Sequence, residues 1–171
     1  CIGATNAESS FRSIKMKVLV TGAGSLLLGG IAQQLAERGD HVVCFQRRTT
    51  ETTHQNLTMF AGDIRDRGSV TEAASGCDAI IHGAARVGVM GSWEDFHSTN
   101  VDGTINVLRA AVEHHIARLV YVSTPSVAHV GDAIEGEIAT PATTGRKRAY
   151  YAESKAQAEI LALQANGADL G

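Results

Sequence analysis

The sequence VLVTGAGSLLLGG, Val18–Gly30, contains the strongest structural signal in this chain. Its apolar run stops at Thr21-Gly22, further glycines stand at 24, 29 and 30, and apolar residues then recur every four positions at 27, 31 and 35. A strand that passes through a glycine-rich loop into a helix places helix N–H groups and the helix dipole where a phosphate can bind. The loop alone leaves two interpretations open, a dinucleotide site or glycines that only the turn requires.

The rest of the chain alternates strand-like and helix-like segments. Short apolar runs predict strands at Lys17–Thr21, His41–Phe45, Leu57–Phe60, Asp78–His82 and Ala117–Ser123. Apolar spacing predicts one helix that ends before Gly39 and others at about 68–75, Trp93–His115 and about 150–166. Buried strands that alternate with helices predict an α/β fold, a doubly wound parallel sheet with helices on both faces.

Composition narrows the partners and the compartment. The 171 residues are 44% hydrophobic and 19% charged with a net charge of −3, which favours one globular domain and no nucleic-acid or membrane partner. Cys1, Cys44 and Cys77 form neither a disulfide framework nor a metal motif, so we expect a reducing, cytoplasmic location and no metal site. We interpret residues 1–15, which lack periodicity, as a disordered extension or tag.

A candidate catalytic pair lies in YYAESK, 150–155, where Tyr151 and Lys155 share one face of a predicted helix. A tyrosine hydroxyl titrates near pKa 10 in water, and a neighbouring ammonium favours the phenolate, so such a pair can act as a general acid or base. The preceding strand ends at Ser123 and Thr124, at the sheet edge where doubly wound folds bind ligands. Either hydroxyl could donate to a substrate oxygen or only cap the strand end.

Six motifs, in order, resemble those of the extended short-chain dehydrogenases/reductases, the NAD-dependent epimerase/dehydratase superfamily. They are VLVTGAGS (18–25), GDIRD (62–66), HGAA (82–85), NVDGTINVL (100–108), YVSTPSV (121–127) and YYAESK (150–155). AARVGVMGSWEDF and STPSV are most similar to the 3β-hydroxysteroid dehydrogenase-like branch, which acts on sterols and other lipophilic alcohols or ketones. The resemblance implies a Rossmann-like NAD(P)-binding domain over residues 16–171, with the family's C-terminal substrate domain absent from this sequence.

The resemblance also implies roles for particular residues. Tyr151 becomes the catalytic acid or base, Lys155 lowers its pKa and holds the nicotinamide ribose, and Thr124 takes the catalytic Ser/Thr position. Asn100 matches a helix asparagine with a mainly structural role. The other residues implied to bind the cofactor lie in the glycine loop (Gly22, Gly24, Ser25, Leu26, Leu27), after the second strand (Arg47, Arg48), at the adenine ring (Asp63, Ile64) and beyond the fourth strand (Ala84, Ala85).

The glycine loop departs from the family pattern at two positions. The family loop T-G-x-x-G-x-x-G would place glycines at 22, 25 and 28, where this chain has Gly22, Ser25 and Leu28. Ser25 is tolerated if its φ stays negative, whereas a leucine at 28 crowds the contact between helix and strand. We therefore expect a dinucleotide site whose binding is weakened or locally rearranged.

The end of the second strand bears on which cofactor binds. Gln46 stands where the family has an acidic residue that binds the ribose 2′-hydroxyl, and Arg47 and Arg48 follow it. An arginine near this position accommodates a 2′-phosphate, and the loss of the acidic residue removes a repulsive charge. The sequence therefore favours NADP(H) over NAD(H), although surface arginines without a ligand remain the alternative.

Together these features predict an NAD(P)-dependent oxidoreductase that interconverts a secondary alcohol and a ketone on a small lipophilic or sterol-like substrate. Two alternatives stay open, a nucleotide-sugar epimerase or dehydratase of the same fold and a non-catalytic nucleotide-binding or scaffold protein. The family pattern continues into a sixth strand, so we expect an exposed edge at Leu119, Val120 and Val122 that a homo-oligomer or a missing C-terminal segment covers.

Overall fold

The computed structural model describes residues 15–49, 51–52, 54–128, 142, 144–145 and 149–167. The strands are β1 (Lys17–Thr21), β2 (His41–Gln46), β3 (Leu57–Ala61), β4 (Ala79–His82) and β5 (Arg118–Tyr121). The helical elements are α1 (Leu26–Arg38), α2 (Arg67–Ala74), α3 (Trp93–His97), η1 (Ser98–Asp102), α4 (Gly103–Glu113), η2 (Pro125–Val127) and α5 (Tyr150–Gln164). The predicted alternation of strands and helices is confirmed. The expected extension, apart from its last residue, lies outside the described residues.

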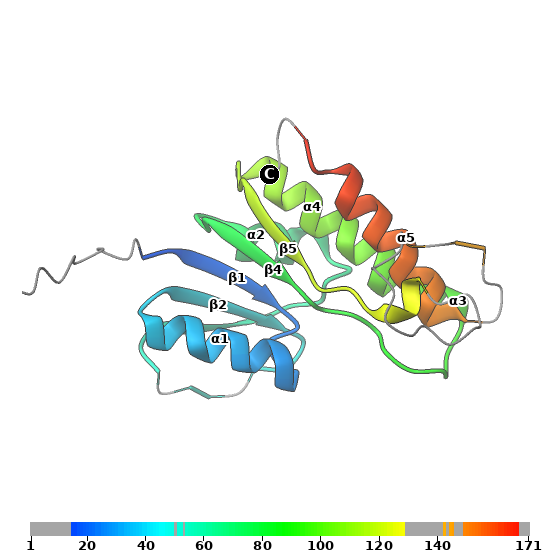
Figure 1. The fold of residues 1–171 in the computed structure, drawn as a ribbon. Coiled ribbons are helices and arrows are strands. Elements are labelled where there is room, and N and C mark those ends of the chain that lie inside the picture. The colour runs from blue at the N-terminus through cyan, green and yellow to red at the C-terminus, as the bar shows by residue number, and fades with distance from the viewer. Residues whose placement is uncertain are drawn as a thin grey trace, which may run out of the picture.

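The five strands form one parallel sheet in the order β3-β2-β1-β4-β5 (Figure 1). The strand order reverses beside β1, because β2 lies on one side of it and β4 on the other. In doubly wound sheets, ligands bind at the carboxyl ends of the strands at such a reversal. In Figure 1 the strand arrows point to the side where both α1 and α5 begin. The glycine loop before α1 and the first turn of α5 therefore lie at the same edge of the sheet.

The central strands supply side chains to two hydrophobic layers, one on each face of the sheet. Successive side chains of a strand point to opposite faces. One layer joins the sheet to α1 and contains Val18, Val20, Leu28, Ala32, Ala36, Val42 and Cys44. The other joins it to α2 and α4 and includes Leu19, Val43, Phe45, Val70, Ala73, Ile80, Val107 and Ala110. The predicted helices on both faces are confirmed, as is the burial of Cys44.

The single helix predicted over Trp93–His115 is wrong in its middle, where α3 gives way to the π-helix η1 before α4 begins. The N–H of Gly103 donates to a carbonyl five residues earlier, and the Thr104 hydroxyl donates to the Asn100 carbonyl at 2.6 Å. A π-turn adds one residue to the turn without a break in helicity, so apolar spacing does not reveal it. Such turns are frequent at functional sites.

β5 is an outer strand of the sheet, because it pairs with β4 alone among the described residues. Its pairing stops at Tyr121, earlier than predicted, as the chain turns into η2. Val120 is 58% exposed, as expected for an open edge, whereas Leu119 and Val122 are half-buried. A cavity of about 420 Å³ follows this edge and is lined by residues of β5, α4 and α5 that include Leu119, Tyr121 and Glu159.

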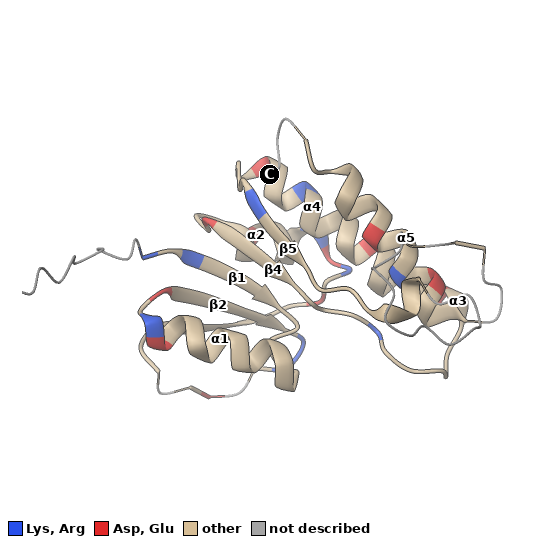
Figure 2. Cartoon of the chain, in the orientation of Figure 1, with Lys and Arg blue, Asp and Glu red and all other residues tan. Residues whose placement is uncertain are grey.

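Charged residues of both signs are spread over several elements, and most of each strand is free of them (Figure 2). Lys17 and Arg118 are exceptions that begin β1 and β5, at the sheet edge opposite the glycine loop. Within the described part of the chain, no helix is long and apolar enough to cross a membrane.

Candidate cofactor and active site

The loop after β1 has the geometry of a phosphate-binding turn. Gly22 has a φ of +78°, and a Cβ at this position would lie 2.8 Å from the backbone nitrogen of Ala84, so only glycine suits both the conformation and the space. Ser25 has a φ of −85°, and its hydroxyl accepts a hydrogen bond from the N–H of Leu28 at 3.3 Å. Ser25 is therefore the N-cap of α1, and the negative φ expected for it is confirmed.

The first turn of α1 is open to a ligand through its backbone. Leu26 and Leu27 begin the helix with exposed side chains, so a phosphate at this point would be held by N–H groups. No acidic residue stands in the first turn, so no side-chain negative charge competes for the positive end of the helix dipole. This arrangement fits the pyrophosphate of a dinucleotide.

The crowding expected at Leu28 does not occur, because Gly83 leaves room for the side chain. Leu28 is 3% exposed in the layer beneath α1, and a Cβ at Gly83 would lie 2.7 Å from its Cδ2 and 2.8 Å from its Cγ. Close approach of the helix to the loop backbone is provided instead by Gly29, where a Cβ would lie 2.9 Å from the Ala23 carbonyl oxygen. The function of the family's third glycine is thus shared between Gly83 and Gly29.

Gln46 ends β2 beside the glycine loop, where the sequence placed the adenosine ribose. It is 9% exposed, and its Oε1 is buried without a hydrogen-bond partner among the described residues. A Cβ at Gly24 would lie 2.8 Å from this oxygen, so the amide lies directly against the loop. Arg47 and Arg48 follow with exposed side chains. The end of β2 thus presents an amide against the glycine loop and two exposed cations after it.

The two residues assigned to the adenine ring follow β3, and their side chains lie in different surroundings. Asp63 is held by Arg65, whose Nε and Nη2 donate to it at 2.9 and 2.6 Å, and this pairing lowers the pKa of Asp63 to about 2. The Ile64 side chain is buried against Gly103, so only its backbone can face a ligand. Asn106 on α4 fixes the segment by donating to the carbonyls of Ile64 and Arg65 at 3.1 Å each.

The predicted catalytic residues lie on two elements, Thr124 just after β5 and Tyr151 and Lys155 on α5. The Thr124 hydroxyl accepts from the N–H of Ser126 at 3.4 Å and donates to Ser126 Oγ at 3.3 Å, so it caps the helix η2 rather than the strand end. Lys155 Nζ donates to the carbonyl of Val122, two residues before Thr124, at 2.7 Å. Tyr151 lies one turn earlier on α5 and is half-buried. Ser123, the other candidate hydroxyl, donates instead to the carboxylate of Glu159.

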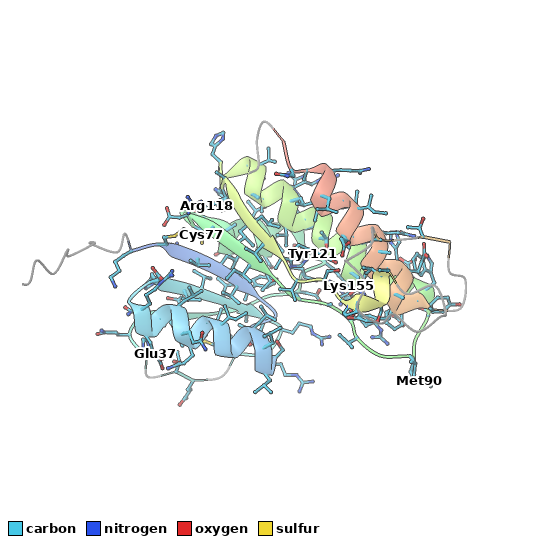
Figure 3. The ribbon with its side chains drawn as sticks, in the orientation of Figure 1. Glu37, Cys77, Met90, Arg118, Tyr121 and Lys155 are labelled. Carbon is cyan, nitrogen blue, oxygen red and sulfur yellow. The ribbon has the colours of Figure 1, made fainter. Side chains whose placement is uncertain are left out.

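Lys155 is a buried ammonium whose pKa is lowered toward neutral pH. It is 4% exposed, and burial lowers its pKa to about 8 while the carboxylate of Glu159 acts in the opposite direction. Its Nζ lies 4.0 Å from the centroid of the Tyr121 ring, and Figure 3 labels the two side chains between β5 and α5. The lysine therefore places a positive charge at the strand end, one helical turn from Tyr151.

A series of buried hydrogen bonds begins at the glycine loop. The Thr21 hydroxyl accepts from the N–H of Ala84 at 3.2 Å and lies 2.7 Å from His82 Nδ1. His82 Nε2 lies 3.0 Å from the hydroxyl of Thr104, which itself donates to the Asn100 carbonyl. These bonds are all satisfied only if His82 is neutral and carries its proton on Nε2. Burial, aided by the charge of Lys155, lowers the pKa of His82 to about 3.

The same series continues into α5 through Asn100. Its side chain accepts from the N–H of Arg86 at 2.7 Å and donates to the Arg86 carbonyl at 3.1 Å and to the Ser154 hydroxyl at 2.9 Å. Ser154 in turn donates to the Tyr151 carbonyl at 3.0 Å. Asn100 thus ties the loop after β4 to α5, in agreement with the structural role that the resemblance implied.

The loop that leaves β4 combines the predicted cofactor residues with an apolar surface. Ala84 and Ala85 are half-buried at its start. Three large apolar side chains farther along are exposed, Val87, Val89 and Met90, the last labelled in Figure 3. The loop ends at Trp93, whose ring lies 5.9 Å from that of Tyr150, and the ring of Phe96 lies 6.3 Å from Tyr150. Exposed apolar side chains and a group of aromatic rings therefore lie next to the start of α5.

Three features of this site were missed by sequence reasoning. Tyr121 contacts Lys155, His82 joins the glycine loop to α4, and Gly83 accommodates Leu28. Position 82 did carry a signal, since a histidine inside an apolar strand must find partners for both ring nitrogens. In the described ranges, no three His, Cys, Asp or Glu side chains are grouped so that they could hold a metal ion.

The site and fold place the chain in a known class. Residues 18–170 match the family model described as NAD dependent epimerase/dehydratase family. The chain belongs to the NAD-dependent epimerase/dehydratase family, and the resemblance carried by the six sequence motifs is confirmed.

Its relatives include reductases and dehydrogenases. The chain is 41% identical over 158 residues to the 2-alkyl-3-oxoalkanoate reductase of Stenotrophomonas maltophilia, a match covering 91% of this chain and 48% of that protein. It is 35% identical over 169 residues to the 3-beta-hydroxysteroid dehydrogenase of Mycolicibacterium neoaurum, covering 94% and 46%. The chain thus spans about half the length of the curated relatives that it matches.

Solved structures agree on the fold. The Bordetella bronchiseptica enzyme WbmH, in complex with NAD+, superposes with a TM-score of 0.75 and 28% identity over 89% of this chain and 53% of its own. MoeE5 in complex with UDP-glucose and NAD superposes with a TM-score of 0.72 and 27% identity over 91% and 52%. Both comparison proteins contain NAD, and the Rossmann-like fold predicted from the sequence is confirmed.

Proposed function

We propose that this chain binds NADP(H) and contributes Thr124, Tyr151 and Lys155 to the interconversion of a secondary alcohol and a ketone on a lipophilic substrate. The observation that carries the proposal is the position of Lys155. Its buried ammonium is held at the C-terminal end of β5 by the Val122 carbonyl, one helical turn from Tyr151. The glycine loop opens at the same edge of the sheet.

The chemistry divides between the cofactor and this chain. A bound nicotinamide supplies or accepts the hydride. The Tyr151 hydroxyl gives a proton to the substrate oxygen during reduction and takes it back during oxidation. The ammonium of Lys155 stabilises the phenolate that remains after the proton has left. Thr124 follows the same strand end, and its hydroxyl, which donates to Ser126 Oγ at 3.3 Å, would turn to donate to the same substrate oxygen.

The preference for NADP(H) is supported by the end of β2. Gln46 offers an amide where the family has a carboxylate, so no negative charge repels a 2′-phosphate. The exposed guanidinium groups of Arg47 and Arg48 are available for charge-assisted hydrogen bonds to that phosphate.

A lipophilic substrate is supported by the loop after β4 and by the relatives. Val87, Val89 and Met90 expose apolar surface next to the aromatic contacts of Trp93 with Tyr150. Exposed apolar clusters of this kind mark ligand or partner surfaces. The relatives named above act on an alkyl oxoalkanoate and on a hydroxysteroid, each of which has a large apolar part.

Cofactor titration tests the first half of the proposal. Fluorescence titrations should show tighter binding of NADPH than of NADH. Replacing Arg47 and Arg48 together by alanine should weaken NADPH binding by about 1–3 kcal/mol and leave NADH binding nearly unchanged. Arg118→Ala, at the opposite edge of the sheet (Figure 3), serves as the matched charge control. Equal affinities for the two cofactors in the unsubstituted protein would contradict the preference.

Turnover assays test the proposed catalytic roles, and they are carried out in a catalytically active protein that contains this chain's residues. Tyr151→Phe should abolish turnover while NADPH affinity stays within about twofold, because it removes one hydroxyl and keeps the ring. Substrates should include alkyl β-keto acids, 3β-hydroxysteroids and sugar nucleotides. Net oxidation of NADPH identifies a reductase, whereas isomerised product without net redox change identifies an epimerase and contradicts the proposal.

A further inference from the structure

A second tyrosine, Tyr121 on β5, lies beneath the ammonium of Lys155. The Nζ atom is 4.0 Å from the centroid of the Tyr121 ring and donates to the adjacent Val122 carbonyl at 2.7 Å. The two contacts come from neighbouring residues at the end of one strand, whereas Lys155 comes from α5. The strand end therefore forms a binding site for a buried cation, which consists of one carbonyl and one aromatic face.

The charged and titratable groups around Lys155 do not include a carboxylate that forms an ion pair with it in the described part of the chain, so the aromatic face is an important partner of its ammonium. Glu159, one turn farther along α5, carries the opposing charge, but its carboxylate accepts from the Ser123 hydroxyl. His82 on β4 is neutral, and Tyr151 shares the helix with the lysine. None of the ion pairs among the described residues contains Lys155. A desolvated cation over an aromatic face is stabilised more strongly than an exposed one.

We infer that Tyr121 is a positioning residue for Lys155. An ammonium has three N–H donors. The Val122 carbonyl takes one and the face of the Tyr121 ring takes another, so the third is left for a ligand. The contact fixes the charge without a carboxylate, which would neutralise it and compete with the ligand for the same donors.

The hydroxyl of Tyr121 is not the functional part of this contact. It is buried and makes no hydrogen bond of normal geometry to any residue that the structure describes. Burial and the nearby Glu159 and Tyr151 groups raise the pKa of this hydroxyl above its ordinary value, so it stays protonated. The ring also packs against His82, with the ring centroids 5.7 Å apart. Tyr121 and Tyr151 therefore differ in role, the first through its face and the second through its oxygen.

Substitutions that keep the shape of the ring and change only its electron density test the inference. Tyr121→Phe retains the face, whereas trifluorophenylalanine and pentafluorophenylalanine at position 121 weaken and then reverse its attraction for a cation at nearly constant size. Tyr121→Leu uses a standard amino acid and removes the aromatic face altogether. Thermal unfolding of each variant checks that it is folded. Each is also made with Lys155→Met, so that any effect that does not act through the lysine is measured separately.

The first readout needs no cofactor. The pKa of Lys155 is measured by NMR of its ε-carbon, with the signal assigned by its loss in Lys155→Met. We expect the same pKa in Tyr121→Phe as in the unsubstituted protein, and a stepwise fall across the fluorinated series as the cation loses its aromatic partner. A pKa that stays constant across the series would overturn the inference.

The second readout, NADPH affinity, rests on the proposed function. Tyr121→Phe should bind normally, and the pentafluoro and leucine variants should bind about 5- to 30-fold more weakly. In the Lys155→Met background these differences should disappear. Equal losses with and without Lys155 would show that Tyr121 acts only on packing and would refute the positioning role. An unsubstituted protein that binds neither cofactor contradicts the proposed function alone, because the lysine titration still decides the role of Tyr121.

Discussion

A methyl group added at Gly83 should destabilise the fold, because Leu28 occupies the space that it would need. The new Cβ would lie 2.7, 2.8 and 3.0 Å from three side-chain carbons of Leu28, well inside the 3.5–4.0 Å of normal carbon contacts. Leu28 is 3% exposed and cannot leave the layer between α1 and the sheet without opening a void. Overpacking of this kind costs about 1–3 kcal/mol, and we expect Gly83→Ala to fall in that range.

A complementary substitution should rescue it. Leu28→Ala alone removes a buried leucine and should cost about 2–5 kcal/mol. In the double variant the methyl at position 83 enters the space that Leu28 has left, so the clash is gone and the cavity is smaller. The double variant should therefore be about 1–3 kcal/mol more stable than the sum of the single effects predicts.

Urea unfolding followed by circular dichroism measures these free energies, with Gly30→Ala as the matched control. Gly30 lies in α1, two residues after Leu28, and a Cβ there would meet no atom within 4 Å, so Gly30→Ala should stabilise the helix by up to about 1 kcal/mol. Additive effects of Gly83→Ala and Leu28→Ala would refute the packing explanation. A Gly83→Ala variant as stable as Gly30→Ala would refute it as well.

Two further predictions concern the buried histidine and the helix cap. Because the folded state lowers the pKa of His82 to about 3, its contribution to stability is complete above the unfolded-state value near 6.5 and is lost as pH falls toward 3, at about 1.4 kcal/mol per pH unit. His82→Gln should therefore reduce the loss of stability between pH 6 and pH 4 in acid titrations of the unfolding free energy, and an unchanged slope would show that other groups cause it. Ser25→Ala should cost about 0.5–1 kcal/mol in the same unfolding assay, at the low end for an N-cap because its bond to the Leu28 N–H is 3.3 Å long, whereas Ser25→Gly should cost a few tenths; equal losses for both would contradict a capping role.

Much of the fold could be predicted from sequence because its signals are local. The strand at Lys17–Thr21, the glycine that ends α1 and the helix that begins at Tyr150 each follow from residues within a few positions of one another. The spacing of Tyr151 and Lys155 is likewise a property of a single helix. Parallel pairing then followed from alternation, since strands separated by helices return to the sheet in the same direction.

The sequence alone thus determined the fold class, the family and the positions of the candidate catalytic groups. Only the tertiary structure decided how those groups are held. Leu28 fits because Gly83, in the loop that follows β4, has no side chain, and Lys155 lies against Tyr121, which comes from β5 rather than from its own helix. Such contacts join residues that are far apart in the chain, and no local periodicity encodes which side chains meet when helix and sheet pack together. The π-turn around Asn100 has the same origin, since the hydrogen bonds of the Asn100 side chain to Arg86 and to Ser154 on α5 exist only in the packed domain.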